Sequence, residues 1–360
     1  MRVLSLSLDG TIIEKNSLLE ERMLSLSAAT GEVTVLVPAN REGKRTLSSH
    51  LSVHAVKGSK KEQFRKLFRI GGTLLKEKPY DLVTAQDPFF LGLVAFLLAR
   101  KAKVPFEVQV HGIERQGGAR KLILRFVLKR ADRVRVVSDR LRRFVAALVG
   151  DAKVYVLPVY SQMSALTGRE AQSPAPKNDG PFTFLTVGRL VPVKNISMQL
   201  CAFATLREEL PRSRLIIVGD GPEADTLKSE ARRLGIGRAV SFEGRQRDLA
   251  PYYTSADAFL LTSDSEGWGV AVIEAALHKL PVIMTDVGLA GDIIKNGESG
   301  IVVPTGNESA LLHAMREVAK SGHLRVRLGE QAYRSARSLP SPEAHISRQV
   351  EEWKRLRACS

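Results

Sequence analysis

The chain has 360 residues, of which 44% are hydrophobic, and its formal net charge at pH 7 is +16. This length and composition suit two domains with separate cores and exclude a disordered protein. Its two cysteines, Cys201 and Cys359, are too few for a disulfide framework or a cysteine metal site, which favours a reducing compartment.

Targeting signals are not evident in the sequence. The chain does not begin with a cationic segment, an apolar core and a cleavage site, so we expect no signal peptide. The longest apolar run, residues 89–99, is well short of the roughly 20 residues that cross a bilayer as a helix. We therefore expect a soluble, cytoplasmic protein.

The positive charge is concentrated in the first half of the chain. Residues 1–180 contain 31 Lys and Arg against 17 Asp and Glu, whereas residues 181–360 contain 23 against 21. This imbalance indicates that the first half faces an anionic partner. Membrane phospholipid, a lipid-phosphate acceptor and nucleic acid all remain open.

Short apolar runs in the first half predict strands that alternate with helices, as in a parallel α/β domain. The first strand is followed by Asp9, Gly10 and Thr11, which predict a β-to-α turn in which Gly10 relaxes the backbone. The predicted strands span residues 2–8, 33–37, 51–56, 82–85, 106–110, 133–137 and 154–157.

Two helical segments, residues 58–78 and 120–130, place an apolar stripe among many basic residues. A helix of this type normally packs its stripe on the sheet and exposes its charges to water. Docking of such a helix on anionic lipid is the alternative, because each nearby Lys or Arg contributes about 1 kcal/mol to binding.

His111 is the candidate site residue of the first half. His111 directly follows a strand and precedes Gly112, which places it at a cleft edge unless it is simply a turn residue.

Residues 171–181 are rich in Pro, Ser and Gly and predict an interdomain linker. The predicted domains are therefore residues 1–170 and 182–340, followed by a helical segment at 341–360.

The second half repeats the α/β pattern. Strands are predicted at residues 182–187, 215–218, 240–242, 258–261, 282–284 and 301–303, and late helices at 308–319 and 324–337. Glycine-containing motifs follow three of these strands. They are Gly188-Arg189 with Lys194, Gly219-Asp220-Gly221, and Gly244-Arg245.

The stretch from Asp257 to Asp286 predicts a strand, a glycine-bracketed loop, a helix at 270–279 and a second strand. In such βαβ units, ligands bind where strands end and helices begin. Glu266 lies in the loop and Glu274 about one and a half turns into the helix, so both can face one cleft. Carboxylates would repel a phosphate, and we therefore expect them to bind hydroxyl groups.

Glu266 and Glu274, with seven residues between them in the setting SEGWG, IEA and LPVI, resemble the signature of retaining family-four (group 1) glycosyltransferases of the GT-B fold. The resemblance continues in VGRL, IVGDGP and FEG, in the same order, and covers the first half only in outline. It implies two Rossmann-like α/β domains facing across a cleft. The first would bind the acceptor and the second the nucleotide sugar, and the C-terminal helix would cross back to the first domain.

Sugar transfer from a nucleotide diphosphate requires stabilisation of the departing diphosphate by a metal or by fixed cations. Arg189 offers a planar fork and Lys194 a point charge, while Gly188 lets the backbone approach. The nearest approach to an Asp-x-Asp metal motif is Asp264-Ser265-Glu266, in which Glu266 already has another role. We therefore expect no metal and no cofactor other than the donor substrate.

The remaining candidate residues surround the same ligand. The loop of Gly267, Trp268, Gly269 and Val270 opens the helix, so its N–H groups can bind phosphate oxygens. The resemblance implies that Glu274 binds the ribose, that Glu266 binds the transferred sugar, and that His111 contacts the donor sugar near the reaction centre. Residues expected to shape the nucleotide pocket are Gly219, Gly221, Gly244 and Arg245, and those implied on the acceptor side are Gly10 and Thr11.

These observations predict a retaining, metal-independent glycosyltransferase of polysaccharide or glycolipid biosynthesis. It would move a hexose from a UDP-, GDP- or ADP-sugar to a saccharide or lipid-linked acceptor, with peripheral contact to the inner face of an anionic membrane left open. Nucleic acid is not an expected partner, because Tyr and Trp are sparse in the basic half. The alternatives are a basic nucleic-acid or anionic-surface binding protein on a degenerate transferase scaffold, and a sugar-nucleotide epimerase of the same fold.

Overall fold

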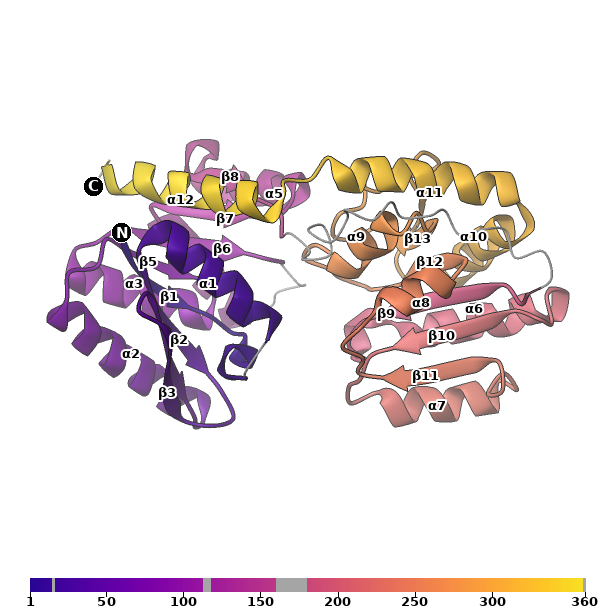
Figure 1. Cartoon of the computed structure of the whole chain (residues 1–360), viewed down its shortest axis with the longest axis horizontal. Helices are drawn as coiled ribbons and strands as arrows, with labels where there is room; N and C mark the ends of the chain where they lie inside the picture. Colours follow the sequence, from indigo (N-terminus) through magenta and orange to yellow (C-terminus); the bar gives the residue numbers. More distant parts are fainter. Residues whose placement is uncertain (15–16, 113–117, 160–179, 359–360) are drawn as a thin grey trace. The chain divides into compact units, whose positions relative to one another are not determined.

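The computed structural model describes residues 1–14, 17–112, 118–159 and 180–358 (Figure 1). The chain forms two α/β units. Unit 1 comprises Met1–Pro158 and Pro342–Ser360, and unit 2 comprises Val159–Ser341. Residues 171–179 of the predicted linker lie outside the described residues.

The described strands of unit 1 form an eight-stranded sheet in the order β3-β4-β2-β1-β5-β6-β7-β8. These strands pair in parallel, apart from β3, which is antiparallel to β4. The sequence predicts no strand at β3, because its polar residues form an exposed edge without alternation. The strands are β1 (Arg2–Leu6), β2 (Glu32–Pro38), β3 (Gly43–Ser48), β4 (Leu51–Val56), β5 (Leu82–Ala85), β6 (Phe106–Val110), β7 (Arg133–Val136) and β8 (Val154–Val156).

Helices cover both faces of this sheet, so alternate strand residues enter two different cores. In β1, Val3 packs in the core that includes residues of α1 and α12, whereas Leu4 packs in the core formed with α2, α3, α4 and α5. The helices of unit 1 are η1 (Gly10–Ile13), α1 (Leu18–Thr30), α2 (Lys60–Glu77), α3 (Phe90–Ala102), α4 (Gly118–Arg130), α5 (Asp139–Val149), η2 (Asp151–Lys153) and α12 (Pro342–Ala358).

Helix α12 belongs to unit 1 although it follows unit 2 in the sequence, as predicted (Figure 1, yellow). Ile346, Val350 and Trp353 lie in the core of unit 1. The Trp353 indole N–H also donates to the carboxylate of Glu107, which is fully buried on β6, at 2.8 Å. The hydroxyl of Tyr155 donates to the same carboxylate oxygen, also at 2.8 Å. A buried carboxylate needs such donors, so α12 helps to stabilise the charge inside unit 1.

Two arginines of β7 extend this polar contact with α12. Arg133 forms an ion pair of 2.6 Å with Glu352. The guanidinium of Arg135, 1% exposed, lies 3.0 Å from Nε2 of His345 and donates to the carbonyl oxygen of Leu157 at 3.1 Å. Charged residues inside a strand are costly unless they have polar partners, and α12 provides some of these partners.

The six described strands of unit 2 form a parallel sheet in the order β11-β10-β9-β12-β13-β14. Every residue of β12 and β13 is buried, as expected for short apolar runs covered on both faces. The strands are β9 (Thr183–Val187), β10 (Arg214–Val218), β11 (Val240–Gly244), β12 (Ala258–Leu261), β13 (Val282–Thr285) and β14 (Ile301–Val303). The helices are η4 (Pro192–Lys194), α6 (Ile196–Glu209), α7 (Ala224–Arg233), α8 (Ala250–Ser255), α9 (Val270–Leu277), α10 (Glu308–Lys320) and α11 (Gly322–Arg337).

The strand order of unit 2 reverses between β9 and β12. From β9 the chain builds outward through β10 and β11, then returns to β12 beside β9 and continues to β13 and β14. The loops after β9 and β12 therefore leave the sheet in diverging directions. Parallel α/β sheets bind ligands at such a switch point.

None of the helices that the structure describes combines the length and apolar content needed to span a bilayer.

Candidate functional site

The loop after β9 (residues 188–195) and the loop after β12 (residues 262–269) are hydrogen-bonded to each other at the switch point. Thr262 Oγ1 donates to the carbonyl oxygens of Lys194 and Asn195 at 3.1 and 3.0 Å. The Asn195 side-chain amide donates to Asp264 Oδ1 at 3.1 Å. A small cavity lies between residues of both loops. The topology thus brings together two motifs that are about 70 residues apart in sequence.

Lys194 and Glu266 meet as an ion pair across these loops. Their side chains are 22% and 13% exposed, and Ser263 Oγ donates to the same Glu266 oxygen at 2.7 Å. The sequence assigns the lysine to phosphate and the carboxylate to a sugar hydroxyl, and does not predict their contact. The pairing keeps two opposite charges in place at the switch point, where each retains capacity for further hydrogen bonds.

Arg189, from the same loop as Lys194, is exposed and forms no ion pair with the residues that the structure describes. Gly188 precedes it, and its N–H donates to the carbonyl oxygen of Val218 at 2.9 Å. The guanidinium of Arg189 therefore provides a cation at this edge that no described carboxylate pairs, and its planar fork suits an anion.

Glycines at the end of β10 let the next loop lie directly on this segment. A Cβ on Gly219, whose φ is +143°, would lie 1.8 Å from the carbonyl oxygen of Gly188. A Cβ on Gly221 would lie 2.2 Å from the carbonyl oxygen of Leu190. Glycine is thus required at both positions for close backbone approach rather than for turn geometry alone.

The predicted segment Gly267–Val270 opens α9. Gly269 is the N-cap with φ of +92°, and no side chain caps the helix, so the first N–H groups lack a side-chain acceptor. The Trp268 side chain is 5% exposed, and its indole nitrogen has no hydrogen-bond partner among the described residues. The uncapped end of α9 therefore provides donors and a positive dipole at the switch point.

Glu274 lies in the middle of α9 and has a partner that the sequence does not predict. The hydroxyl of Tyr253, on α8, donates to Glu274 Oε2 at 2.9 Å. The Tyr253 ring is fully buried and stacks on His278 with centroids 5.1 Å apart. Burial, followed by the charge of Glu274, raises the pKa of Tyr253 well above its ordinary value, so the phenol stays a donor. Tyr253 thus fixes the orientation of this carboxylate.

Gly244 and Arg245 lie at the end of β11, the edge strand on the β9 side of the sheet. The carbonyl oxygen of Gly244 accepts a hydrogen bond from the N–H of Gly219 at 2.8 Å, which links this strand end to the preceding loop. Arg245 is exposed. These residues extend the row of loops at the carboxyl end of the sheet.

The predicted acceptor residues Gly10 and Thr11 belong to unit 1, in η1 after β1. Asp9 caps this turn and accepts from the Thr11 backbone N–H at 3.0 Å and from its hydroxyl at 2.7 Å. Arg45 further holds the turn by donating to the carbonyl oxygen of Glu14 at 3.1 Å. The Thr11 hydroxyl is therefore already engaged within the turn.

His111, in the same unit, follows β6 and is half-buried. Burial, and then the positive charges of Arg135 and Arg22, lower its pKa from 6.5 to about 3. The imidazole is therefore neutral at physiological pH and can act as a hydrogen-bonding group, but not as a cation.

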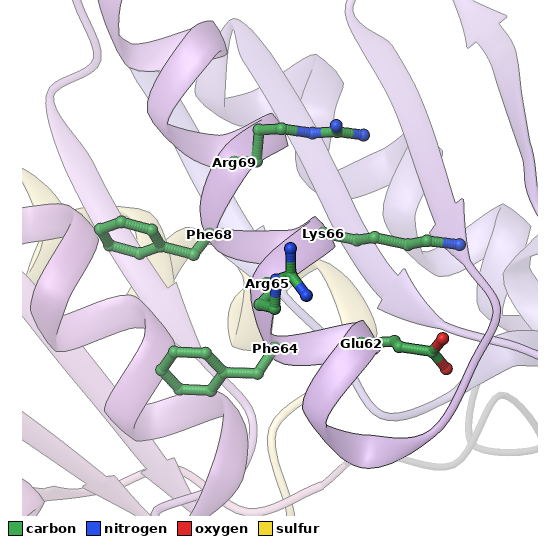
Figure 2. A pocket seen from close by; sticks show the side chains of 6 residues that line it. All are labelled: Glu62, Phe64, Arg65, Lys66, Phe68 and Arg69. Carbon is green, nitrogen blue, oxygen red and sulfur yellow. The ribbon is translucent and has the colours of Figure 1, made fainter.

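Two other features of the structure bear on ligand binding. Among the described residues, no group of three or more His, Cys, Asp or Glu side chains lies close enough to hold a metal ion. A larger hollow than the one at the switch point lies on α2 of unit 1, lined by Phe64, Phe68 and charged neighbours (Figure 2). That hollow contains none of the predicted site residues.

Two family descriptions match the chain. Glycosyl transferases group 1 matches residues 167–335, and the glycosyl transferase 4-like domain matches residues 20–159. The alpha-monoglucosyldiacylglycerol synthase of Streptococcus pneumoniae is 29% identical over 232 residues, which cover 58% of this chain and 53% of that protein. The lipopolysaccharide core biosynthesis glycosyltransferase LpsE of Rhizobium meliloti is 29% identical over 170 residues, 46% of this chain and 49% of that protein. These matches span about half the length of the curated relatives.

Two solved structures match over all or nearly all of the chain. The sucrose-phosphate synthase of Thermosynechococcus elongatus superposes with a TM-score of 0.83 at 19% identity and covers 100% of both chains. HepE of Anabaena, in complex with UDP and glucose, has a TM-score of 0.76 at 20% identity and covers 98% of both chains. At this identity the likeness concerns the fold, and it confirms the predicted GT-B fold.

Proposed function

The chain belongs to the group 1 glycosyltransferases, and from this premise we propose that it moves a hexose from a nucleotide diphosphate sugar to a saccharide or lipid-linked acceptor. The related structure of HepE contains UDP and glucose, which supports a donor of this class.

Three features that lie together at the switch point of unit 2 support the proposal. They are the exposed Arg189, the ion pair of Lys194 with Glu266, and the uncapped N-terminus of α9. Fixed cations and helix N–H groups stabilise the charge that develops on a departing diphosphate, and stabilisation of this kind usually lowers the barrier more than any other catalytic effect. We therefore assign this charge stabilisation to the protein and propose that no metal takes part.

The two carboxylates act on hydroxyl groups in this proposal. Glu274, oriented by Tyr253, binds the ribose, and Glu266 binds the transferred sugar while it restrains Lys194. A carboxylate offers about four acceptor sites, so Glu266 can bind a hydroxyl and keep its lysine. His111, neutral at physiological pH, binds the donor sugar as a hydrogen-bonding group.

Retention of the anomeric configuration is part of the proposal. The carboxylates of Glu266 and Glu274 interact with Lys194 and Tyr253 and are assigned to hydroxyl groups, which favours a route without a covalent sugar intermediate. In this route the leaving phosphate accepts the proton of the acceptor hydroxyl as the new glycosidic bond forms on the same face.

The acceptor is assigned to unit 1, and its excess of basic residues favours an anionic acceptor or an anionic membrane as its partner. Sugar transfer, rather than simple binding of polyanions or epimerisation of the donor, is the function that we expect.

A thermal-shift panel of UDP-, GDP- and ADP-sugars tests the donor site. The preferred donor at 100 times its dissociation constant should raise the free energy of unfolding by about 2.7 kcal/mol. Arg189→Gln should reduce this gain, whereas Arg238→Gln should preserve it, since this exposed arginine precedes β11 at the opposite end of the sheet. Stabilisation by none of the nucleotide sugars would refute the proposal. NMR of the product anomer tests retention, and activity after chelation tests metal independence.

A further inference from the structure

The two basic amphipathic helices of unit 1 differ in how they use their apolar residues. On α2, Phe64 and Phe68 project to the side opposite Glu62 and Lys66 (Figure 2). Phe64 packs edge-on against Phe90 of α3, with centroids 6.0 Å apart, and both phenylalanines pack against the core. Phe64 and Phe68 are therefore half-buried against unit 1, although they also line the hollow on α2, and neither is among the exposed large hydrophobic residues.

Helix α4 has an apolar residue pattern that is only partly covered. Leu124, Val127 and Leu128 are buried in the core, whereas Leu122 is 70% exposed and Phe126 is 36% exposed. The neighbouring helix α5, which contacts α4, leaves Phe144 48% exposed. Together these are three of the five exposed large hydrophobic residues among those that the structure describes.

The charges on α4 adjoin these apolar side chains. The helix contains five basic residues and no acidic residue. Lys121, Arg125 and Lys129 are exposed, and none forms an ion pair with a described residue. With Leu122 and Phe126 they span an arc of about 140° on one side of the helix. Like charges four residues apart destabilise an isolated helix. Because no described carboxylate pairs with these three cations, an external anion would reduce the repulsion between them.

We propose that this α4–α5 surface docks on an anionic lipid bilayer. The surface is defined by Leu122, Phe126, Phe144, Lys121, Arg125 and Lys129. The apolar side chains enter the boundary between headgroups and acyl chains, and the basic side chains bind lipid phosphates. A second copy of the chain would present the same positive charge and be repelled, which favours lipid as the occupant. The inference rests on the proposed membrane contact of unit 1 and assigns it to α4 rather than α2.

The test is co-sedimentation of the full-length protein with vesicles of phosphatidylcholine alone or mixed with phosphatidylglycerol. Lys121→Glu/Arg125→Glu/Lys129→Glu should lower the partition coefficient onto anionic vesicles by at least about 100-fold, because it removes three attracted cations and adds three repelled carboxylates. Lys60→Glu/Lys61→Glu/Arg65→Glu is the matched control, because it makes the same change of charge at exposed positions of α2. It should weaken binding much less. Leu122→Ser should weaken binding that persists at high salt, since it removes apolar insertion without changing charge.

The outcomes separate the parts of the proposal. Equal loss in the two charge variants, or a greater loss in the α2 variant, would overturn the assignment to the α4–α5 surface. Equal pelleting of the unmodified protein with neutral and anionic vesicles would overturn the role of the basic side chains in docking, and no pelleting with either would overturn the membrane contact itself. Stabilisation by nucleotide sugars is measured separately on the same proteins, so a failed donor site is not confused with a failed docking surface.

Discussion

Replacing Gly219 with alanine should disable the donor site by moving the loop that carries its cations. The new Cβ would lie 1.8 Å from the carbonyl oxygen of Gly188, whereas ordinary contacts begin at 3.4 Å, so the loop must retreat by about 1.6 Å. Arg189 and Lys194 follow in this loop. A displacement of 1 Å at a reacting group can cost about 100-fold in rate, and we expect a loss of at least this size in kcat/KM.

The assay is release of nucleotide from the donor that gives the largest thermal shift, together with a urea unfolding curve. Gly235→Ala is the control, because Gly235 also has a positive φ, +72°, but a Cβ there would meet nothing within 4 Å. Both variants should lose about 1–3 kcal/mol from backbone strain. Only Gly219→Ala should also lose activity. If both variants kept their activity at saturating and limiting donor, the loop contact would not position the cations.

Three further perturbations test other contacts. Tyr253→Phe should raise the KM for the donor several-fold with little change in kcat, because it frees the Glu274 carboxylate from its hydroxyl partner. Trp353→Phe should lower the free energy of unfolding by about 2–4 kcal/mol in urea, since it removes a hydrogen bond to a buried carboxylate and leaves a cavity. Burial lowers the pKa values of His111 and His345 from 6.5 to about 3 and about 2, so stability should fall as the pH drops below 6.5. As the pH falls, these two histidines bind protons in the unfolded chain before they do so in the folded protein. Each therefore contributes up to about 1.4 kcal/mol per pH unit to the slope of the free energy of unfolding.

Each of these predictions has a contrary result. Tyr252→Phe is a matched control for the tyrosine, because its hydroxyl lies 3.4 Å from Glu243 and not at Glu274. Equal effects of the two substitutions on KM would argue against an orienting role for Tyr253. An unchanged urea midpoint in the tryptophan variant would mean that α12 is not held by the buried carboxylate. His345→Gln should flatten the stability profile between pH 6.5 and 3, and an unaltered slope would contradict the origin that we give for it.

The elements that the sequence predicts well are those with a local signal. The apolar runs of β12 and β13 and the glycine-bracketed loop before α9 are recognisable within a few residues of each other. By contrast, β3 is polar and exposed, and it is a strand because its backbone pairs with β4. Its sequence alone carries no hydrophobic alternation from which to predict that pairing.

At the candidate site the contacts that the sequence does not predict are long-range. Lys194 and Glu266 are both predicted site residues, but their pairing depends on the adjacency of β9 and β12, which residue spacing does not reveal. Tyr253 belongs to a short helix without a motif, and its relation to Glu274 emerges only when α8 and α9 are placed in three dimensions. A buried tyrosine hydroxyl needs an acceptor, and this is the signal by which such a partner could be sought.

Because α12 completes unit 1, the order of synthesis differs from the order in which the two units can finish folding. Residues 1–158 leave the ribosome first, but the side chains of Ile346, Val350 and Trp353 emerge about 200 residues later. At typical elongation rates this is a delay of about 10–40 s, during which unit 2 is completed. The nascent first unit must meanwhile persist with part of its apolar surface uncovered, which makes this interval the natural point for chaperone engagement.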